Sequence, residues 1–295
     1  MQRALAATDV MVSEVLPACD IFVGLSGMGV KSAKVARQKH NSKVIIDRGA
    51  QHVLEQMRLN SGKPSGFLND WYVQRELSSY EQADVISVPT QVVKRSFSKN
   101  GFHQKKVFVN PYGVDTNLFY PDVPGKKVFN RVLFVGSWSY QKGCDYLPDI
   151  IESNPKTEFV HCGVVKDLEL PKGKNFRSMG KTSRSDLAAL MRSSDLLILP
   201  SRQDGFGLVL LEALSSGLLV VASDQTGAPE IKSYLPDKSS IQVFRSEDPE
   251  DLRNAFEQAR DIRSNINRSD IHQITKANFS WAAYAKRFQE RFYNA

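Results

Sequence analysis

The sequence has few cysteines and no long apolar run, and both absences exclude classes of protein. Its three cysteines, Cys19, Cys144 and Cys162, are scattered and form no C-x-x-C pair, so neither a disulfide framework nor a structural zinc site is predicted. No apolar run approaches the roughly 20 residues that cross a bilayer. The opening MQRALAATDVMVSEVLPACD takes up acidic residues early and lacks the apolar core of a signal peptide. We therefore expect a cytoplasmic protein with reduced thiols.

Dense basic runs with interleaved aromatic residues are also absent, although the net charge is +7 and the pI is near 9.2. This excess of positive charge favours phosphorylated ligands or the surface of a membrane as partners, and no nucleic acid is predicted. Apolar residues make up 41% of the chain and charged residues 24%, which is the balance of a folded protein.

Short apolar segments alternate with helical patterns along the chain, which is typical of parallel α/β domains. A Pro- and Gly-rich passage at 110–127 interrupts this alternation and predicts a linker. Four strands are predicted before it and six after it, at 20–25, 43–47, 84–89, 106–111, 132–136, 158–163, 176–180, 195–201, 218–224 and 240–244. We expect two doubly wound, Rossmann-like domains.

The predicted domains are residues 1–117 and 118–278, followed by an amphipathic helix over 279–295. That helix is expected to carry an aromatic stripe that packs on the core, formed by Phe279, Tyr284, Phe288 and Phe292.

The most informative segment is LLILPSRQDGFGLVLLEALSSGLLVVASD at 196–224. A buried strand ends at Pro200 and Ser201, and a loop with Asp204 leads into Gly205-Phe206-Gly207 and then a helix. The glycines permit close approach of a ligand, and the N–H groups of Gly205 to Leu208 at the helix start favour a phosphate. Glu212 lies about one turn further along and could accept hydrogen bonds from ribose hydroxyls.

Two other strand-end loops carry similar chemistry. VGSWSYQKG at 135–143 contains Ser137 and places Lys142, a cation for a diphosphate, before a helix, and TGAPEI at 226–231 follows another strand. Open α/β sheets bind ligands at the carboxyl ends of their strands, so these loops are expected to converge on one site.

These segments together resemble glycosyltransferase family 4, the retaining group with the GT-B fold, in which two Rossmann-like domains face a cleft. The hallmark of that family is an acidic residue, seven residues and then Glu, with G-F-G after the first acid, and it reads DGFGLVLLE here. The resemblance runs from about residue 44 to the end of the chain and includes NPYGVDTNLFYP and Gly-x-Pro-Glu. It implies that Asp204 contacts the transferred sugar and that Glu212 contacts the ribose.

Two positions depart from the family pattern. The first acid is usually Glu, whereas this chain has the shorter Asp204. An Arg commonly follows the Gly of the phosphate loop, whereas this chain has Ser137, which leaves Lys142 with a larger share of the diphosphate charge.

In the N-terminal half, the resemblance implies a cleft-facing catalytic His after the strand KVIID. His52 is the candidate, and Arg48 is a further candidate contact of the diphosphate or acceptor. The alternative for His52 is a histidine bonded to the backbone at a helix start. The remaining histidines have no constellation around them.

A competing pattern occurs in GLSGMGVKS at 24–32, where Gly27-x-Gly29-x-x-Ser32 lies between a strand and a helix, and Asp47 ends the next strand. This spacing is similar to a dinucleotide fingerprint and supports an NAD-dependent oxidoreductase as a second class of function. It leaves the three C-terminal loops unexplained.

The resemblance implies transfer of a hexose-type sugar from a nucleoside diphosphate sugar to a hydroxyl acceptor, lipid-linked or polysaccharide, in polysaccharide biosynthesis at the inner face of a membrane. No cofactor is expected, and because no D-x-D pair occurs, no metal is expected either. By comparison with the family, we expect an incomplete N-terminal domain that is shorter than usual and without the family's first strand. A third class, a nucleotide-sugar-binding protein impaired in catalysis, therefore remains open.

Overall fold

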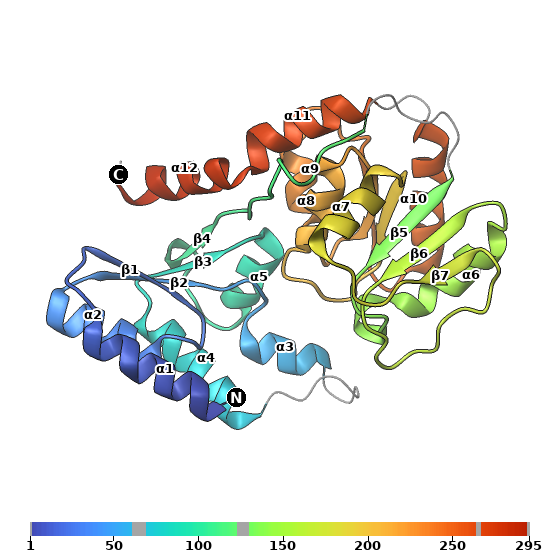
Figure 1. Cartoon of the computed structure of the whole chain (residues 1–295). Coiled ribbons are helices and arrows are strands. Elements are labelled where there is room, and N and C mark those ends of the chain that lie inside the picture. Colours follow the sequence, from blue (N-terminus) through green and yellow to red (C-terminus); the bar gives the residue numbers. More distant parts are fainter. Residues whose placement is uncertain (1, 61–68, 123–129, 264–266, 294–295) are drawn as a thin grey trace. The chain divides into compact units, whose positions relative to one another are not determined.

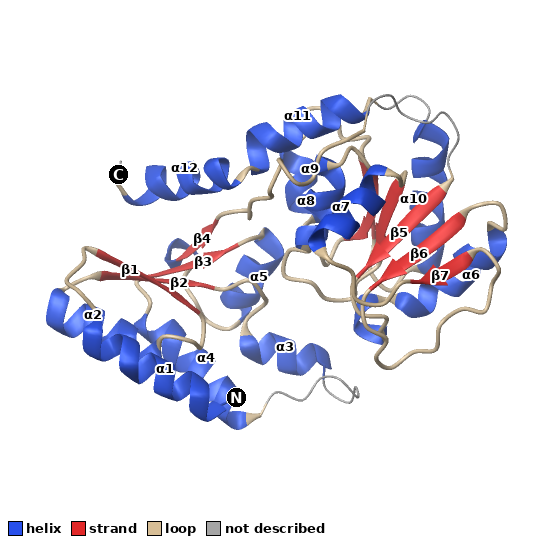
Figure 2. Cartoon of the chain, in the orientation of Figure 1, coloured by secondary structure: helices blue, strands red, loops and turns tan. Residues whose placement is uncertain are grey.

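The computed structural model describes residues 2–60, 69–122, 130–263 and 267–293, and it divides the chain into two compact units, 1–110 and 111–295 (Figure 1). The boundary falls at the start of the passage predicted as a linker, whose residues 123–127 lie outside the described part. Each unit has its own apolar core and its own parallel sheet, and helices alternate with the strands in both (Figure 2).

Unit 1 contains a four-stranded parallel sheet in the order β1-β2-β3-β4, so the four predicted strands are present. Apolar side chains from the sheet and its helices form the core, which includes the aromatic rings of Tyr80 and Phe97. In chain order its elements are α1 (Gln2–Val15), β1 (Ile21–Leu25), α2 (Val30–His40), β2 (Lys43–Asp47), α3 (Val53–Asn60), α4 (Asp70–Gln82), β3 (Val85–Val88), α5 (Gln91–Lys99), η1 (Gln104–Lys106) and β4 (Val107–Val109).

The sequence did not predict helix α1, because this helix buries polar side chains and exposes apolar ones. It buries two polar residues, Asp9 and Ser13, while Met11 and Val15 are 67% and 79% exposed. The Asp9 carboxylate accepts hydrogen bonds from the backbone N–H groups of Lys31 and Ser32, at 2.9 and 3.0 Å. These N–H groups belong to the first turn of α2, so α1 is held by capping a neighbouring helix.

Unit 2 contains a six-stranded parallel sheet in the order β10-β9-β8-β5-β6-β7, which matches the six predicted strands. The central strands β8 and β9 are buried throughout, as expected of strands covered on both faces. In chain order its elements are β5 (Arg131–Val135), η2 (Tyr140–Lys142), η3 (Cys144–Tyr146), α6 (Leu147–Ser153), β6 (Glu158–Cys162), β7 (Phe176–Ser178), α7 (Arg184–Arg192), β8 (Leu196–Leu199), α8 (Leu208–Ser215), β9 (Leu219–Ser223), α9 (Ala228–Tyr234), β10 (Ile241–Phe244), α10 (Pro249–Ile262), α11 (Arg268–Phe279) and α12 (Trp281–Phe292).

The aromatic stripe predicted for one closing helix is divided between two helices. Phe279 ends α11 and is fully buried, whereas α12 begins after it and contains no fully buried residue among those described. Ser280 separates the helices because its backbone is extended and its hydroxyl accepts a hydrogen bond from Ala283 N–H, which is an N-cap. Tyr284 and Phe288 stack with their ring centroids 6.4 Å apart, so the helical spacing is confirmed for the part within α12.

No helix in the described part of the chain combines the length and the hydropathy needed to cross a membrane.

Candidate functional site

The predicted donor residues lie at the point where the strand order of unit 2 reverses. From β5 the chain proceeds to β6 and β7 on one side, whereas β8, β9 and β10 continue on the other. The loops that leave the carboxyl ends of β5 and β8 therefore start from neighbouring strands and diverge. Such a switch point is where open parallel sheets bind their ligands.

The loop after β8 forms an uncapped helix start. Gly207 is the N-cap of α8 with φ +75°, a conformation that favours glycine, and no side chain caps the helix there. No acidic residue lies in the first turn of α8, so nothing in that turn opposes the binding of an anion. Phe206 N–H faces Asp204 Oδ1 at 3.4 Å. The start of α8 therefore has the geometry of a phosphate-binding helix terminus.

The side chain of Phe206 serves to hold this loop in place. It is 2% exposed, and its ring packs edge-on against Tyr112 with centroids 5.5 Å apart. Its carbonyl accepts a hydrogen bond of 2.7 Å from Gly227 N–H, and a Cβ at Gly227 would lie only 2.4 Å from that oxygen. The predicted role of Phe206 toward a ligand is thus restricted to its backbone. The close approach of this carbonyl oxygen explains why the third loop, TGAPEI, has glycine at position 227.

Lys142 and Asp204 meet across the two loops. The Nζ atom of Lys142, at the end of η2, lies 2.5 Å from Asp204 Oδ2, and the two side chains are 23% and 18% exposed. They are separated by 62 residues in the sequence. The structure therefore brings together the predicted cation for the diphosphate and the predicted acid for the sugar.

Glu212 occupies the predicted position on α8, one turn beyond the helix start. Its side chain is 18% exposed, and its charged partner among the described residues is Arg184, at the start of α7, whose Nη2 lies 3.6 Å from Oε1. Burial raises the pKa of Glu212, and the Arg184 charge opposes that effect only in part. A distance of 3.6 Å is an ion-pair contact and too long for a hydrogen bond, so the acceptor capacity of Glu212 is not met by Arg184.

Two further predicted donor residues lie at these loops. Ser137 follows β5, and its hydroxyl lies 3.3 Å from that of Ser139. Leu208, at the start of α8, is 46% exposed.

The loop after β5 is fixed by His161, whose Nε2 lies 2.9 Å from the carbonyl oxygen of Gly136. Burial lowers the pKa of His161, which favours a neutral ring that donates from Nε2 and accepts from Ser178 through Nδ1. His161 therefore has a structural role that the sequence does not indicate. Its partners lie on neighbouring strands and leave no local sequence signal.

Arg202 is a second residue that the sequence reasoning missed. Its guanidinium pairs with Asp145 and lies against the rings of Tyr140 and Tyr146, so it joins the loops after β8 and β5. The sequence around Arg202 does not indicate these partners, because they lie more than 50 residues earlier in the chain.

His52 and Arg48 lie within unit 1. His52 is 1% exposed, and its ring packs among Tyr80, Phe97 and Phe102 with centroids 5.0 to 5.5 Å apart. Burial, aided by the charge of Arg48, lowers the pKa of His52 to about 4. Its Nδ1 accepts from Leu54 N–H at 3.3 Å, which is the backbone contact expected under the alternative interpretation. The catalytic role of His52 stays a prediction.

Arg48 is 7% exposed and is engaged with buried partners. Its Nη1 lies 2.7 Å from Glu76, which is itself fully buried, and its Nη2 donates to the side chain of Gln56 and the carbonyl of Gln51. An arginine held in this way is committed to the core of unit 1, and a ligand would need to compete with Glu76 for it.

The loop that resembles a dinucleotide fingerprint is filled by the protein itself. The first turn of α2, where a pyrophosphate would bind, is capped by the Asp9 carboxylate. Arg75 donates to the carbonyl groups of Gly27 and Met28 and pairs with Asp9 at 2.8 Å. An internal carboxylate thus occupies the place of the anion, and this disfavours the binding of NAD at this loop.

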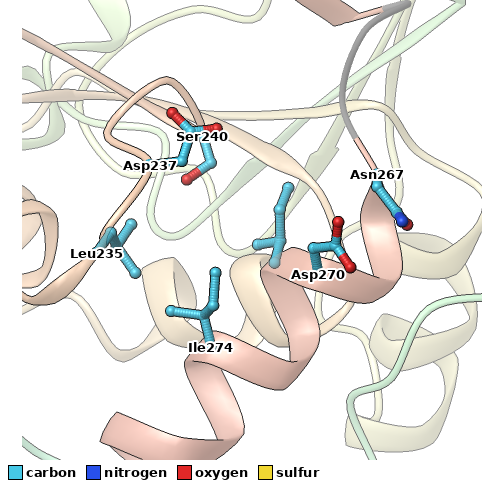
Figure 3. A pocket seen from close by; sticks show the side chains of 7 residues that line it. Leu235, Asp237, Ser240, Asn267, Asp270 and Ile274 are labelled. Atoms are coloured by element: carbon cyan, nitrogen blue, oxygen red, sulfur yellow. The ribbon is translucent and has the colours of Figure 1, made fainter.

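A pocket of about 340 Å³ lies elsewhere on unit 2, beside α11 (Figure 3). Its lining includes Leu235, Asp237, Ser240, Asp270 and Ile274. Ser240 directly precedes β10, so the pocket lies at the amino end of that strand, opposite to the predicted donor loops. None of the residues predicted for the donor site lines it. In the described part of the chain, no group of three or more His, Cys, Asp or Glu residues is arranged to hold a metal ion.

The parallel sheet, the switch point and the helix start of unit 2 define an α/β unit of the Rossmann-like kind. Residues 129–261 match the family model described as glycosyl transferases group 1. The resemblance predicted from the sequence is therefore confirmed for this part of the chain.

Curated relatives agree with this assignment. A phosphatidylinositol N-acetylglucosaminyltransferase subunit from Arabidopsis thaliana is 28% identical over 228 residues, which cover 73% of this chain and 49% of that protein. An uncharacterized glycosyltransferase from Methanocaldococcus jannaschii is 32% identical over 181 residues, which cover 52% of this chain and 46% of that protein. The chain thus spans about half the length of these relatives.

Solved structures confirm the fold. Sucrose-phosphate synthase from Thermosynechococcus elongatus has a TM-score of 0.73 at 17% identity, covering 99% of this chain and 77% of that one. HepE from Anabaena, in complex with UDP and glucose, has a TM-score of 0.72 at 16% identity, covering 99% of this chain and 81% of that one. The predicted α/β fold with two Rossmann-like units, as in GT-B glycosyltransferases, is therefore confirmed.

Proposed function

We propose that this protein is a glycosyltransferase that moves a sugar from a nucleoside diphosphate sugar to a hydroxyl acceptor with retention of configuration, without a metal ion. The observation that carries the proposal is the ion pair of Lys142 and Asp204 in the loops beside the uncapped start of α8, with Glu212 one turn further along that helix. The family match and the UDP-bound structure of HepE support the choice of donor.

The ion pair between Lys142 and Asp204 must open when a donor binds. The contact is itself a hydrogen bond between charged groups, of the kind that contributes about 1.5–3 kcal/mol. A bound donor would replace it with hydrogen bonds of the same kind, from Lys142 to a diphosphate and from a sugar hydroxyl to Asp204. Without a ligand, each side chain neutralises the other and keeps it near its working position.

The charged groups have different roles in the proposed reaction. Glu212 binds the ribose hydroxyls, and Asp204 binds the sugar and stabilises the positive charge that develops on it. Lys142 and the N–H groups at the start of α8 stabilise the negative charge that grows on the departing diphosphate. Because these donors are already oriented by the fold, they need little reorganisation during the reaction. This is the basis for proposing that no metal is required, and turnover should persist in excess EDTA.

The acceptor is proposed to be a lipid-linked or polysaccharide hydroxyl at the cytoplasmic face of a membrane, consistent with the net charge of +7. A second candidate is a nucleotide-sugar-binding protein with impaired catalysis. This second candidate is favoured by the burial of His52 and Arg48, the two residues of unit 1 that were predicted to act in catalysis or in binding the diphosphate or acceptor.

A thermal-shift screen tests the proposal. Because a ligand that binds only the folded protein raises its melting temperature, UDP, GDP, ADP and their sugars should include at least one that stabilises the chain, whereas NAD and NADP should not. Stabilisation by the nicotinamide cofactors alone would contradict the proposal. Release of nucleoside diphosphate from the bound sugar donor then separates the transferase from the binding protein.

A further inference from the structure

Arg202 connects the two loops that carry the proposed donor residues. Its backbone N–H donates to the carbonyl of Gln141 at 3.0 Å, and its Nη1 donates to the carbonyl of Tyr140 at 2.6 Å. Its two terminal nitrogens also bind the two oxygens of Asp145, at 2.6 and 2.7 Å. These bonds join the loop after β8 to the segment 140–145, which follows β5.

The guanidinium of Arg202 also stacks on aromatic rings. Its central carbon lies 3.7 Å from the ring centroid of Tyr140 and 4.3 Å from that of Tyr146. The side chain is 8% exposed, so these contacts are largely shielded from water. A planar group with several donors can bind a carboxylate through two nitrogens and also lie over aromatic rings, and a lysine cannot replace it.

A second contact between the same loops is independent of Arg202. Gly143, with φ +69°, packs against the end of β8 so closely that a Cβ would lie 2.0 Å from the carbonyl oxygen of Pro200. Gly143 and Arg202 therefore fix the loop after β5 at two points of the segment that follows β8, one at Pro200 and one at Arg202.

Lys142 lies between these two points, next to Gly143 and two residues after Tyr140, while Asp204 lies two residues after Arg202. We infer that Arg202 is a positioning residue of the donor site: it holds the loop of Lys142 against the loop of Asp204, so that the lysine faces the diphosphate at the start of α8. This inference rests on the function proposed above. Arg202 acts through Lys142 and does not itself touch the donor.

A double-mutant cycle tests this dependence. The variants are Arg202→Met, Lys142→Met and the combination of both, with Arg131→Met as a matched control. Arg131 also binds a carboxylate, that of Glu158 at 2.6 Å, but it does so at the amino end of β5, away from the loops. The affinities of UDP, GDP, ADP and the corresponding nucleosides are measured by calorimetry.

Arg202→Met should weaken the binding of the preferred diphosphate about tenfold, the size of one charged hydrogen bond, and leave the affinity of its nucleoside unchanged. The double variant should bind no more weakly than Lys142→Met alone, because Arg202 has no effect once its target is absent. Arg131→Met should retain full affinity. If Arg202→Met fails to fold, Arg202→Lys and Asp145→Asn replace it, and each should weaken diphosphate binding while leaving nucleoside binding unchanged.

Full diphosphate affinity in the folded Arg202 variant, or losses that add in the double variant, would overturn the inference and leave the proposed function intact. Equal losses for the diphosphate and its nucleoside would also overturn it, since they would indicate a general disturbance of unit 2. Absence of diphosphate binding by the unaltered protein would instead contradict the proposed function.

Discussion

The charged residues of the proposed donor site differ in how firmly the protein already holds them. Lys142 and Asp204 neutralise each other at 2.5 Å, whereas Glu212 meets a mostly exposed Arg184 at 3.6 Å. Burial raises the pKa of Glu212, so its charge is costly in the ligand-free protein. Ribose hydroxyls that donate to Glu212 would offset that cost, and we therefore expect it to contribute strongly to nucleotide affinity.

The charge of Asp204 is expected to matter more than its length. Asp204→Asn should abolish transfer, because an amide neither pairs with Lys142 nor stabilises a positive sugar. Asp204→Glu should retain part of it, since Glu is the usual family residue. The measurement is the release of nucleoside diphosphate, with Asp237→Asn, at the opposite end of the sheet, as the control. Equal turnover of the Asn variant and the unaltered protein would reduce Asp204 to a turn residue.

His52 is expected to make stability depend on pH. Burial lowers its pKa from 6.5 to about 4, so the unfolded chain takes up a proton before the folded one does. Stability should therefore be complete above pH 6.5 and fall as the pH decreases toward 4, by on the order of 3 kcal/mol at most.

The variant His52→Phe keeps an aromatic ring among Tyr80 and Phe97 but cannot take up a proton. Urea denaturation at several pH values should show a flatter decline for this variant. The lowered pKa of His161 acts in the same direction but is common to both proteins, so the difference isolates His52. An identical decline in the two proteins would show that the imidazole does not titrate in this way.

At the scale of elements, β1 is the exposed edge of the unit 1 sheet. It pairs with β2 alone, and its Val23 and Leu25 are 51% and 61% exposed. In contrast, β8 and β9 lie inside the unit 2 sheet and are buried throughout. An exposed, apolar edge strand is prone to local unfolding and to pairing with a strand of another chain.

Hydrogen exchange should therefore be faster in residues 20–47 than in 195–224. The edge strand β10 is a matched control within unit 2, since it is also paired on one side only. If unit 1 is the less stable unit, its internal strand β2 should also exchange faster than β10. Equal protection of the two segments would indicate that the shorter sheet of unit 1 does not lower its local stability.

The strands were predictable because their apolar runs are local, and all ten form where the alternation placed them. Helix α1 was not, because the residues it buries are Asp9 and Ser13, whose partners include the first turn of α2. Likewise, the donor motif identified Lys142, Asp204 and Glu212 as candidates, but not the side chains that hold them. The contacts of Arg202 and His161 depend on which strands become neighbours, and no local pattern contains that information.

At the scale of the whole molecule, the family match and the proposed donor groups fall in the same unit. Residues 129–261 contain Ser137, Lys142, Asp204 and Glu212, while unit 1 contributes buried networks around Arg48 and His52. We therefore predict that nucleotide binding is a property of unit 2.

Calorimetric titration of the nucleoside diphosphate preferred by the unaltered protein tests the proposed donor site most directly. Glu212→Ala should weaken its affinity at least about tenfold, because hydrogen bonds to a charged group contribute about 1.5–3 kcal/mol. Glu257→Ala, which removes a carboxylate from the surface of α10, should leave the affinity unchanged. Unchanged affinity in a folded Glu212→Ala protein would contradict the claim that the donor binds at the edge of unit 2 beside α8.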